Sequence, residues 1–163
     1  MPLVCRQAEA ADFPALQQLL ELYQYELSDL WHQELDVQAR YGSDLSRHRQ
    51  AQRFFAHIAV DGKQYVGFAL VAPAAVTRSK GFWMEQFFIL KAHRRHGAGA
   101  TLAQHVFRSH PGLWEVGQMP ANVAAHAFWR RVIDAHTGGH FTELTLTSRW
   151  WKGVVQQFRS GAA

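Results

Sequence analysis

The central pattern of this chain is the stretch FWMEQFFILKAHRRHGAGAT at residues 82–101. Its first nine residues, 82–90, are apolar and aromatic with Glu85 as the one carboxylate, which predicts a β-strand. Residues 98–109 place apolar side chains at helical spacing, so a helix is expected there. Two arginines, a histidine and two glycines join the two elements. The pattern therefore predicts a strand, a tight basic turn and a helix.

The turn has the chemistry of an anion site. Gly97 and Gly99 permit main-chain paths that are closed to residues with a β-carbon, and they let a ligand approach the backbone. A helix that begins here presents unpaired N–H groups and the positive end of its dipole. Arg94 and Arg95 add charge beside it. We therefore predict a phosphate site; because the spacing matches neither nucleotide-binding glycine signature, an ordinary tight turn is the alternative.

The remaining sequence supplies the elements of an α/β domain. Asp12 is expected to cap a helix that carries Pro14 in its first turn. Asp61-Gly62 between two apolar runs predicts a hairpin. Along the chain, the expected elements are a strand at 3–6, a helix to about residue 25, a short helix or two with loops over 28–53, strands at 54–60, 63–71 and 82–90, a helix over 98–109, a strand at 113–118, a helix over 123–135, and closing strands at 141–146 and 151–158.

This order predicts the fold class. A strand, helix and strand over 82–118 imply a parallel pair with a right-handed crossover. The other neighbouring strands are antiparallel, so we expect a mixed, mostly antiparallel sheet flanked by helices. The 163 residues fit one domain, 1–163, with a single substantial core.

Composition limits the classes of function. Apolar residues make up 48% and charged residues 18%, which is globular, and the net charge of +4 suits a polyanionic partner. The arginines gather at the glycine turn and after residue 122, so nucleic acid is ranked last as a partner. One cysteine leaves no intrachain disulfide and favours a reducing, cytoplasmic setting. No apolar run has the length of a signal peptide or membrane span, so no membrane partner is expected.

Two motifs together resemble a known family. Arg94-x-x-Gly97-x-Gly99 follows the strand, and ANVAAHAFW at 121–129 follows the next strand. This resembles the GNAT superfamily of acetyl-CoA-dependent N-acetyltransferases, whose pyrophosphate loop is written Q/R-x-x-G-x-G/A. The family's second motif is an Asn, an Ala three residues on, and Phe-Tyr after three more. The chain departs from it at Trp129, where tyrosine is usual.

The resemblance implies that coenzyme A lies in a splay between the parallel strands 82–90 and 113–118. The pantetheine arm would pair with the main chain at the end of the first strand, and the pyrophosphate would lie on N–H groups of the glycine turn. The N–H of Ile89 or its neighbour would polarise the acetyl carbonyl. The implied cofactor-binding residues are Phe88, Ile89, Leu90, Arg94, Arg95, His96, Gly97, Ala98, Gly99, Ala100, Asn122, Phe128 and Trp129.

Acetyl transfer needs a neutral amine, and Glu85 is the expected base. An alkylamine of pKa about 10.4 costs about 4.6 kcal/mol to deprotonate at pH 7. Strand alternation puts Glu85 on one face with the side chains of residues 83, 87 and 89, beside the pantetheine end. The alternatives are a glutamate on a half-exposed face or one that binds the charge of an acceptor. His57 and His126 are the reserve bases.

The leaving thiolate lacks the usual tyrosine, because the indole of Trp129 is no usable acid. A thiol of pKa about 8.5 leaves at pH 7 for only about 2 kcal/mol, so the loss is tolerable. Water, Tyr65 or Tyr23 would then supply the proton. Trp129 is interpreted as a core residue or one that packs on pantetheine.

Other clusters carry weaker expectations. No carboxylate or cysteine completes the histidine pairs 93/96 and 136/140, so no metal is expected. Trp150-Trp151 predicts strand packing, with a homodimer contact as the alternative. Trp31, Tyr41 and the stretch 28–53 are where an acceptor pocket is expected. The leading function is an acetyltransferase that acts on a primary amine of a small molecule or protein; the alternative is a non-catalytic acyl-CoA-binding domain.

Overall fold

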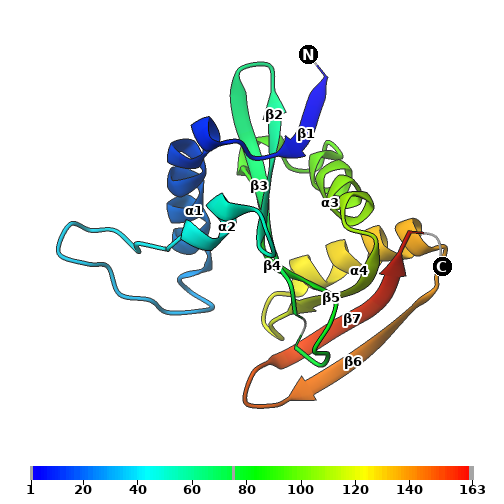
Figure 1. Cartoon of the computed structure of the whole chain (residues 1–163). Helices are drawn as coiled ribbons and strands as arrows, with labels where there is room; N and C mark the ends of the chain where they lie inside the picture. Colours follow the sequence, from blue (N-terminus) through cyan, green and yellow to red (C-terminus); the bar gives the residue numbers. More distant parts are fainter. Residues whose placement is uncertain (1, 75, 162–163) are drawn as a thin grey trace.

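A computed structural model describes residues 2–74 and 76–161. In these residues seven strands form one sheet, in the order β1-β2-β3-β4-β5-β7-β6 (Figure 1). The strands are β1 (Leu3–Gln7), β2 (Phe55–Asp61), β3 (Gln64–Ala72), β4 (Phe82–Ile89), β5 (Gly112–Gln118), β6 (Phe141–Thr147) and β7 (Lys152–Ser160). The helices are α1 (Phe13–Leu27), α2 (Ser46–Gln50), α3 (Ala98–Ser109) and α4 (Val123–Thr137), with short 3-10 turns η1 (Ala10–Asp12) and η2 (Lys91–His93). The expected α/β class and mixed sheet are confirmed.

The helices cover the two faces of the sheet, α1 and α2 on one and α3 and α4 on the other (Figure 1). The apolar stripe of α1, including Leu16 and Leu20, packs on Phe68 and Phe88. The larger cluster contains α3 and α4 together with the fully buried Trp114 of β5. Helices α1, α3 and α4 therefore each bury an apolar stripe at helical spacing.

The parallel pair opens almost as soon as it forms. Strand β4 pairs with β5 at Phe82–Trp114 and Trp83–Glu115, and the described residues show no later pair between them. Strand β5 instead pairs with β7 along its whole length. The carboxyl-terminal half of β4 therefore has a free edge on the β5 side, and the expected splay between these strands is confirmed.

A β-bulge interrupts β4 just after the pairing ends. In the ladder with β3, Val71 lies opposite Met84 and Leu70 lies opposite Gln86, so Glu85 is the extra residue. A bulge bends its strand and changes the direction of the side chains that follow it. The regular alternation of side chains between the two faces of β4 is therefore interrupted at Glu85.

Asp12 does not cap α1, contrary to the sequence expectation. Its carboxylate binds the guanidinium of Arg6 at 2.7 and 3.0 Å and accepts the Tyr65 hydroxyl at 2.7 Å and the Glu9 N–H at 2.7 Å. The bond from Arg6 is the main reason that the pKa of Asp12 falls to about 2. A charged partner competes successfully for a carboxylate that could otherwise accept helical N–H groups.

The segment between α1 and α2, residues 28–45, extends away from the body of the molecule (Figure 1). Its returning end is held by α1, because the carboxylate of Glu21 accepts the Tyr41 N–H at 2.8 Å and the Gly42 N–H at 2.9 Å. Trp31 and Val37 in this segment are exposed. Among the described residues, no helix combines the length and apolar character needed to cross a membrane.

Candidate active site

The two glycines after β4 are required for different physical reasons. Gly97 has a φ of 84°, a left-handed conformation that disfavours any β-carbon, although a β-carbon there would meet no atom within 4 Å. Gly99 has an ordinary backbone, but its β-carbon would lie 3.0 Å from the ring of Phe128. Arg95 also has a positive φ, 65°, so the turn is tightly wound just before α3.

The start of α3 offers unpaired donors at the end of β4. Thr101 donates its N–H to the carbonyl of Gly97 at 3.0 Å, which is the first bond of the helical ladder. The N–H groups of Ala98, Gly99 and Ala100 therefore have no acceptor inside the helix. Arg95, His96 and Gly97 are exposed beside them. The residues present fit a diphosphate, and the phosphate site stays a prediction.

Arg94 has a different position from the one expected. Its guanidinium makes a two-point ion pair with Glu26 at the end of α1, at 2.8 and 2.6 Å. Its Nε donates to the carbonyl of Ile89 at 2.7 Å. The charge that was expected beside a phosphate is already neutralised by a carboxylate. Arg94 instead joins α1 to the last residue of β4.

The main chain of β4 points a donor into the opening beside β5. Leu90 donates its N–H to Val66 on β3 at 2.9 Å, one residue after β4 ends at Ile89. N–H directions alternate along a strand, so the N–H of Ile89 faces away from β3, toward the free edge. This is where the proposed carbonyl-binding group was expected.

Glu85 lies on the α1 and α2 side of the sheet, which corrects the alternation prediction. It meets Nε2 of His48 in α2 at 3.1 Å, whereas Phe87 and Ile89 pack into the core beneath α3 and α4. The bulge is the physical reason, because the extra residue changes the face to which Glu85 points. The Glu85 side chain is 24% exposed and that of His48 only 2%. A carboxylate open to solvent is thus held by a buried imidazole.

His48 is the residue that sequence reasoning missed. It lies in a helix of five residues within a polar stretch without a clear period, and the chain has ten histidines. Its Nδ1 is buried and has no hydrogen-bond partner within the described residues. Its spacing of three from the buried Leu45 is the one local signal that it faces inward.

A model of the acetyltransferase (GNAT) family matches residues 14–133. The chain belongs to the GNAT acetyltransferase family. No curated protein sequence matches it significantly.

Solved structures share this GNAT fold at low sequence identity. The PaiA N-acetyltransferase from Thermoplasma acidophilum, in complex with coenzyme A, has a TM-score of 0.71 at 10% identity, covering 98% of this chain and 99% of that one. AAC(6')-Iy, in complex with the bisubstrate analogue CoA-S-monomethyl-acetylneamine, has a TM-score of 0.67 at 19% identity, covering 91% and 98%. Ribosomal-protein-alanine N-acetyltransferase from Brucella melitensis has a TM-score of 0.63 at 19% identity, covering 96% and 99%.

The second GNAT motif forms the wall behind the glycine turn. Asn122 caps α4 as expected, accepting the N–H of Ala125 at 3.3 Å. Phe128 packs against Gly99, and Trp129 is 5% exposed and lies edge-on to Phe87 at 4.8 Å. The interpretation of Trp129 as a core residue is confirmed. Contact of these residues with a cofactor stays a prediction.

Of the two tyrosines considered as proton donors, Tyr23 is the one near β4. Its ring lies edge-on to Phe68 and Phe88, each at 5.7 Å. Burial, and secondly the charge of Glu26, raises its pKa to about 12, while the main chain of Phe87 acts in the opposite direction. The hydroxyl of Tyr65 is bound to Asp12 instead.

The reserve bases lie elsewhere. His57 is buried among other histidines, and burial lowers its pKa to about 3. His126 pairs with Glu143 of β6 at 3.2 Å.

In the described part of the chain, no three His, Cys, Asp or Glu side chains are placed to hold a metal ion. The expected packing of the two tryptophans holds for Trp151, which lies edge-on to Trp83 at 5.2 Å, but it is wrong for Trp150, which is exposed.

Proposed function

We propose that this GNAT protein transfers the acetyl group of acetyl-CoA to a primary amine by direct attack. The observation that carries the proposal is the sequence of groups along β4. The Glu85–His48 pair lies at its bulge, the Ile89 N–H faces the opening, and the glycine turn with its unpaired donors follows. Acetyl-CoA would supply the thioester, with its diphosphate on the turn and its pantetheine arm along Phe88, Ile89 and Leu90.

Each group has one task. The N–H of Ile89 would polarise the carbonyl, and Arg94 holds the main chain at that residue through the Ile89 oxygen. Glu85 would receive the amine proton. Because it precedes Ile89 by four residues, about 13 Å along an extended strand, that proton would travel through intervening water. Tyr23, neutral at pH 7, would donate a hydrogen bond to the departing sulfur.

The acceptor belongs to a class and is not a named compound. The structures that share this fold include one whose name specifies a ribosomal-protein alanine and one solved with an acetylneamine analogue. They support a small-molecule or protein amine. The acceptor would bind on the α1 and α2 side, near the segment that carries Trp31 and Tyr41.

We also propose a cytoplasmic setting for the protein. The side chain of Trp150 is 76% exposed, and we propose that it forms a contact between two copies of the chain in a homodimer.

The test separates binding from catalysis. Acetyl-CoA or CoA at millimolar concentration should raise the melting temperature, because the turn forms in the folded state; a ligand at 100 times its Kd adds about 2.7 kcal/mol to the unfolding free energy. Free CoA thiol should then be released with at least one member of a panel of primary amines. No thermal shift would contradict the cofactor assignment. A shift without thiol release for any amine favours the non-catalytic acyl-CoA-binding alternative, which the absent tyrosine at position 129 supports.

A further inference from the structure

A cavity lies at the end of the sheet opposite the glycine turn. It is formed where β2, β4 and β5 begin and β7 ends, and its volume of about 640 Å³ is within the range of small-molecule sites. Strand β4 runs from Phe82 at this cavity to Ile89 at the proposed acetyl site. Seven residue steps along this strand separate Phe82 from Ile89, a distance of about 23 Å.

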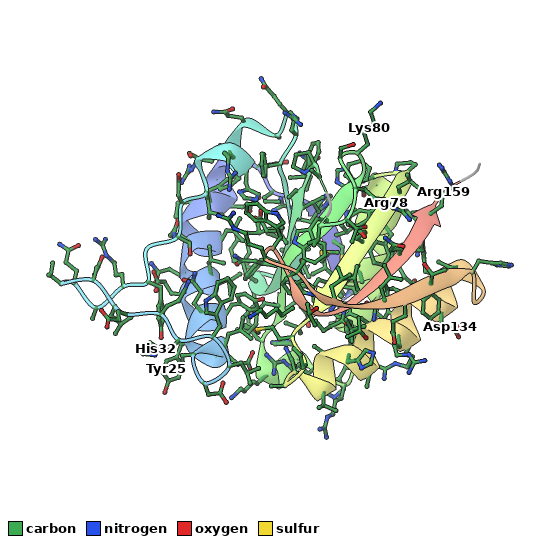
Figure 2. All side chains as sticks on the ribbon, turned by 90° about the horizontal axis from the view of Figure 1, so that it is seen from below. Tyr25, His32, Arg78, Lys80, Asp134 and Arg159 are labelled. Atoms are coloured by element: carbon green, nitrogen blue, oxygen red, sulfur yellow. The ribbon has the colours of Figure 1, made fainter. Side chains whose placement is uncertain are left out.

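Among the described residues, three cations line this cavity and no carboxylate does. Arg53, Lys80 and Arg159 come from three different segments of the chain. Within residues 2–74 and 76–161, none of the three forms an ion pair. Figure 2 shows Lys80 and Arg159 on the same side of the molecule, with Arg78 near them. Like charges around a hollow whose described lining contains no carboxylate favour a positive local potential there, which attracts an anion.

The inner wall of the cavity is aromatic. The ring of His110 lies 4.4 Å from that of Phe55 and 5.3 Å from that of Phe82, centre to centre. His110 is buried, and Leu113 completes the apolar side. Phe55 and Phe82 are only partly buried, so their rings offer apolar surface that a flat apolar ligand can contact. The cavity thus combines a cationic rim with an apolar wall.

The loop that carries Lys80 is held by hydrogen bonds to side chains of β5 and β7. Glu115, fully buried on β5, accepts hydrogen bonds from the Thr77 N–H at 3.0 Å and from its hydroxyl. Gln157 of β7 donates to Thr77 Oγ1 and to Glu115, both at 2.7 Å. These bonds hold the loop without using any of the three cations. A rim that is already ordered loses less entropy on binding.

We propose that this cavity binds a small organic anion with a flat, apolar body, at a site separate from the acetyl-CoA site. The anionic group would lie among Arg53, Lys80 and Arg159, and the body against Phe55, Phe82 and His110. The hollow is open to solvent, and its volume of about 640 Å³ suits a small molecule better than an extended polyanion. The inference does not depend on the acetyl transfer proposed above.

The probes are indole-3-carboxylate and adenosine 5′-monophosphate, which present a carboxylate and a phosphate on flat bodies. Neutral indole and inorganic phosphate serve as the matched partial probes. Titration calorimetry, with amide NMR shifts to locate the site, should show at least one full probe binding about tenfold or more tightly than either partial probe. The better full probe identifies the source of the anion. Saturating acetyl-CoA should leave the probe bound.

Two variants test the residues. Lys80→Gln with Arg159→Gln should weaken the probe at least about tenfold. Lys152→Gln, which removes the same charge at the other end of β7, should leave its affinity unchanged. A cooperative thermal transition and an unchanged far-UV circular dichroism spectrum in the double variant would show that the fold is intact; if that variant fails to fold, Arg53→Gln should weaken binding in its place.

Several results would overturn the proposal. These are no binding of either full probe at millimolar concentration, equal binding of a partial probe, unchanged affinity in a folded double variant, and displacement by acetyl-CoA. Binding of single-stranded RNA while neither small probe binds would also overturn it, because the site would then accept a polymer instead of a small molecule.

Discussion

Glu85 shows how one side chain can carry the proposed chemistry without being deeply buried. It remains partly open to solvent, so it can exchange protons, while the buried His48 restricts its position. The His48 nitrogen that does not face Glu85 has no partner in the described residues, so the imidazole is not held by a second acceptor. Glu85 could instead attract a cationic acceptor, and kinetics distinguishes the two roles.

Glu85→Gln is expected to lower kcat by about 10²- to 10⁴-fold, the usual contribution of a general base. Affinity for acetyl-CoA should be nearly unchanged, because Glu85 lies on the opposite face from the core wall behind the turn. The residual rate should rise with pH as more amine becomes neutral. The measurement is kcat against pH at saturating acceptor. Wild-type kcat with a raised acceptor KM would show that Glu85 binds charge and is no base.

His48→Gln should reproduce part of the Glu85→Gln defect, since His48 acts through Glu85. A positioning role predicts non-additivity, so the double variant should have nearly the same kcat and pH profile as Glu85→Gln alone. His126→Gln, a change in a histidine that pairs with Glu143, is the matched control and should leave kcat unchanged. Fully additive losses would mean that His48 acts independently.

Tyr23→Phe is expected to lower kcat by about tenfold, equivalent to one lost hydrogen bond of about 1.4 kcal/mol. The aromatic packing on Phe68 and Phe88 would be kept. Trp129→Phe, at the position where the family usually has tyrosine, should retain most activity because the indole serves packing. Both are measured as kcat and as acetyl-CoA affinity. A wild-type rate in Tyr23→Phe would assign the proton to water.

The turn between β4 and α3 acts as one element, because its parts constrain each other. Gly97 supplies the left-handed backbone, Gly99 admits the Phe128 ring, and Arg94 anchors the strand end to Glu26. Donors at the start of α3 therefore have a set position relative to the Ile89 N–H. A change in any of these parts should move the proposed diphosphate site relative to the acetyl site.

Gly97→Val and Gly99→Val should both weaken acetyl-CoA binding strongly, for separate reasons. The first forces a β-branched residue to a φ of 84°, at a cost of order 1–3 kcal/mol. The second drives a side chain into the ring of Phe128. Gly62→Val is the control, because it imposes similar strain at a φ of 61° in the β2–β3 turn. Calorimetric affinity should be spared in Gly62→Val alone; equal weakening in all three would indicate general destabilisation.

At the level of the whole molecule, three histidines join the sheet to α3. His57 lies between His110, at 2.8 Å from Nε2 to Nε2, and His105, at 3.2 Å from Nδ1 to Nε2. A neutral His57 can donate from one ring nitrogen and accept at the other, but a protonated one cannot accept. Burial is the main cause that lowers the pKa of His57 to about 3 and that of His110 to about 4. Burial, and secondly the charge of Arg108, also lowers the pKa of His105.

The protein should therefore lose stability as the pH falls below about 6.5, the ordinary pKa of histidine in an unfolded chain. Between that pH and the lower pKa values of the folded state, the unfolded state binds more protons than the folded state. The unfolding free energy therefore decreases as the pH decreases. Each such histidine contributes up to about 1.4 kcal/mol per pH unit. Urea unfolding from pH 7.5 to 5 should show a shallower slope for His57→Gln than for the control His93→Gln. A flat wild-type profile would contradict the neutral-cluster interpretation.

Local pattern was sufficient for the elements and for the position of the glycine turn. The strand at 82–90, the helix after Gly97, the Asn122 cap and the core position of Trp129 all follow from spacing and side-chain type. Backbone sterics and helical or strand hydrogen bonds act over a few residues, so neighbouring residues are enough to specify them. The family resemblance, built on the same short motifs, was confirmed for the same reason.

The partners of the site residues needed the folded chain. One bulge moved Glu85 to the other face of β4, and no local signal marks that bulge. His48 meets Glu85 across 37 residues and Arg94 meets Glu26 across 68. Asp12 pairs with Arg6 and does not cap α1, because the first strand and the start of α1 come together in the fold. Such pairs depend on register and packing between distant segments, where a shift of one residue changes every contact, and no short stretch of sequence contains that information.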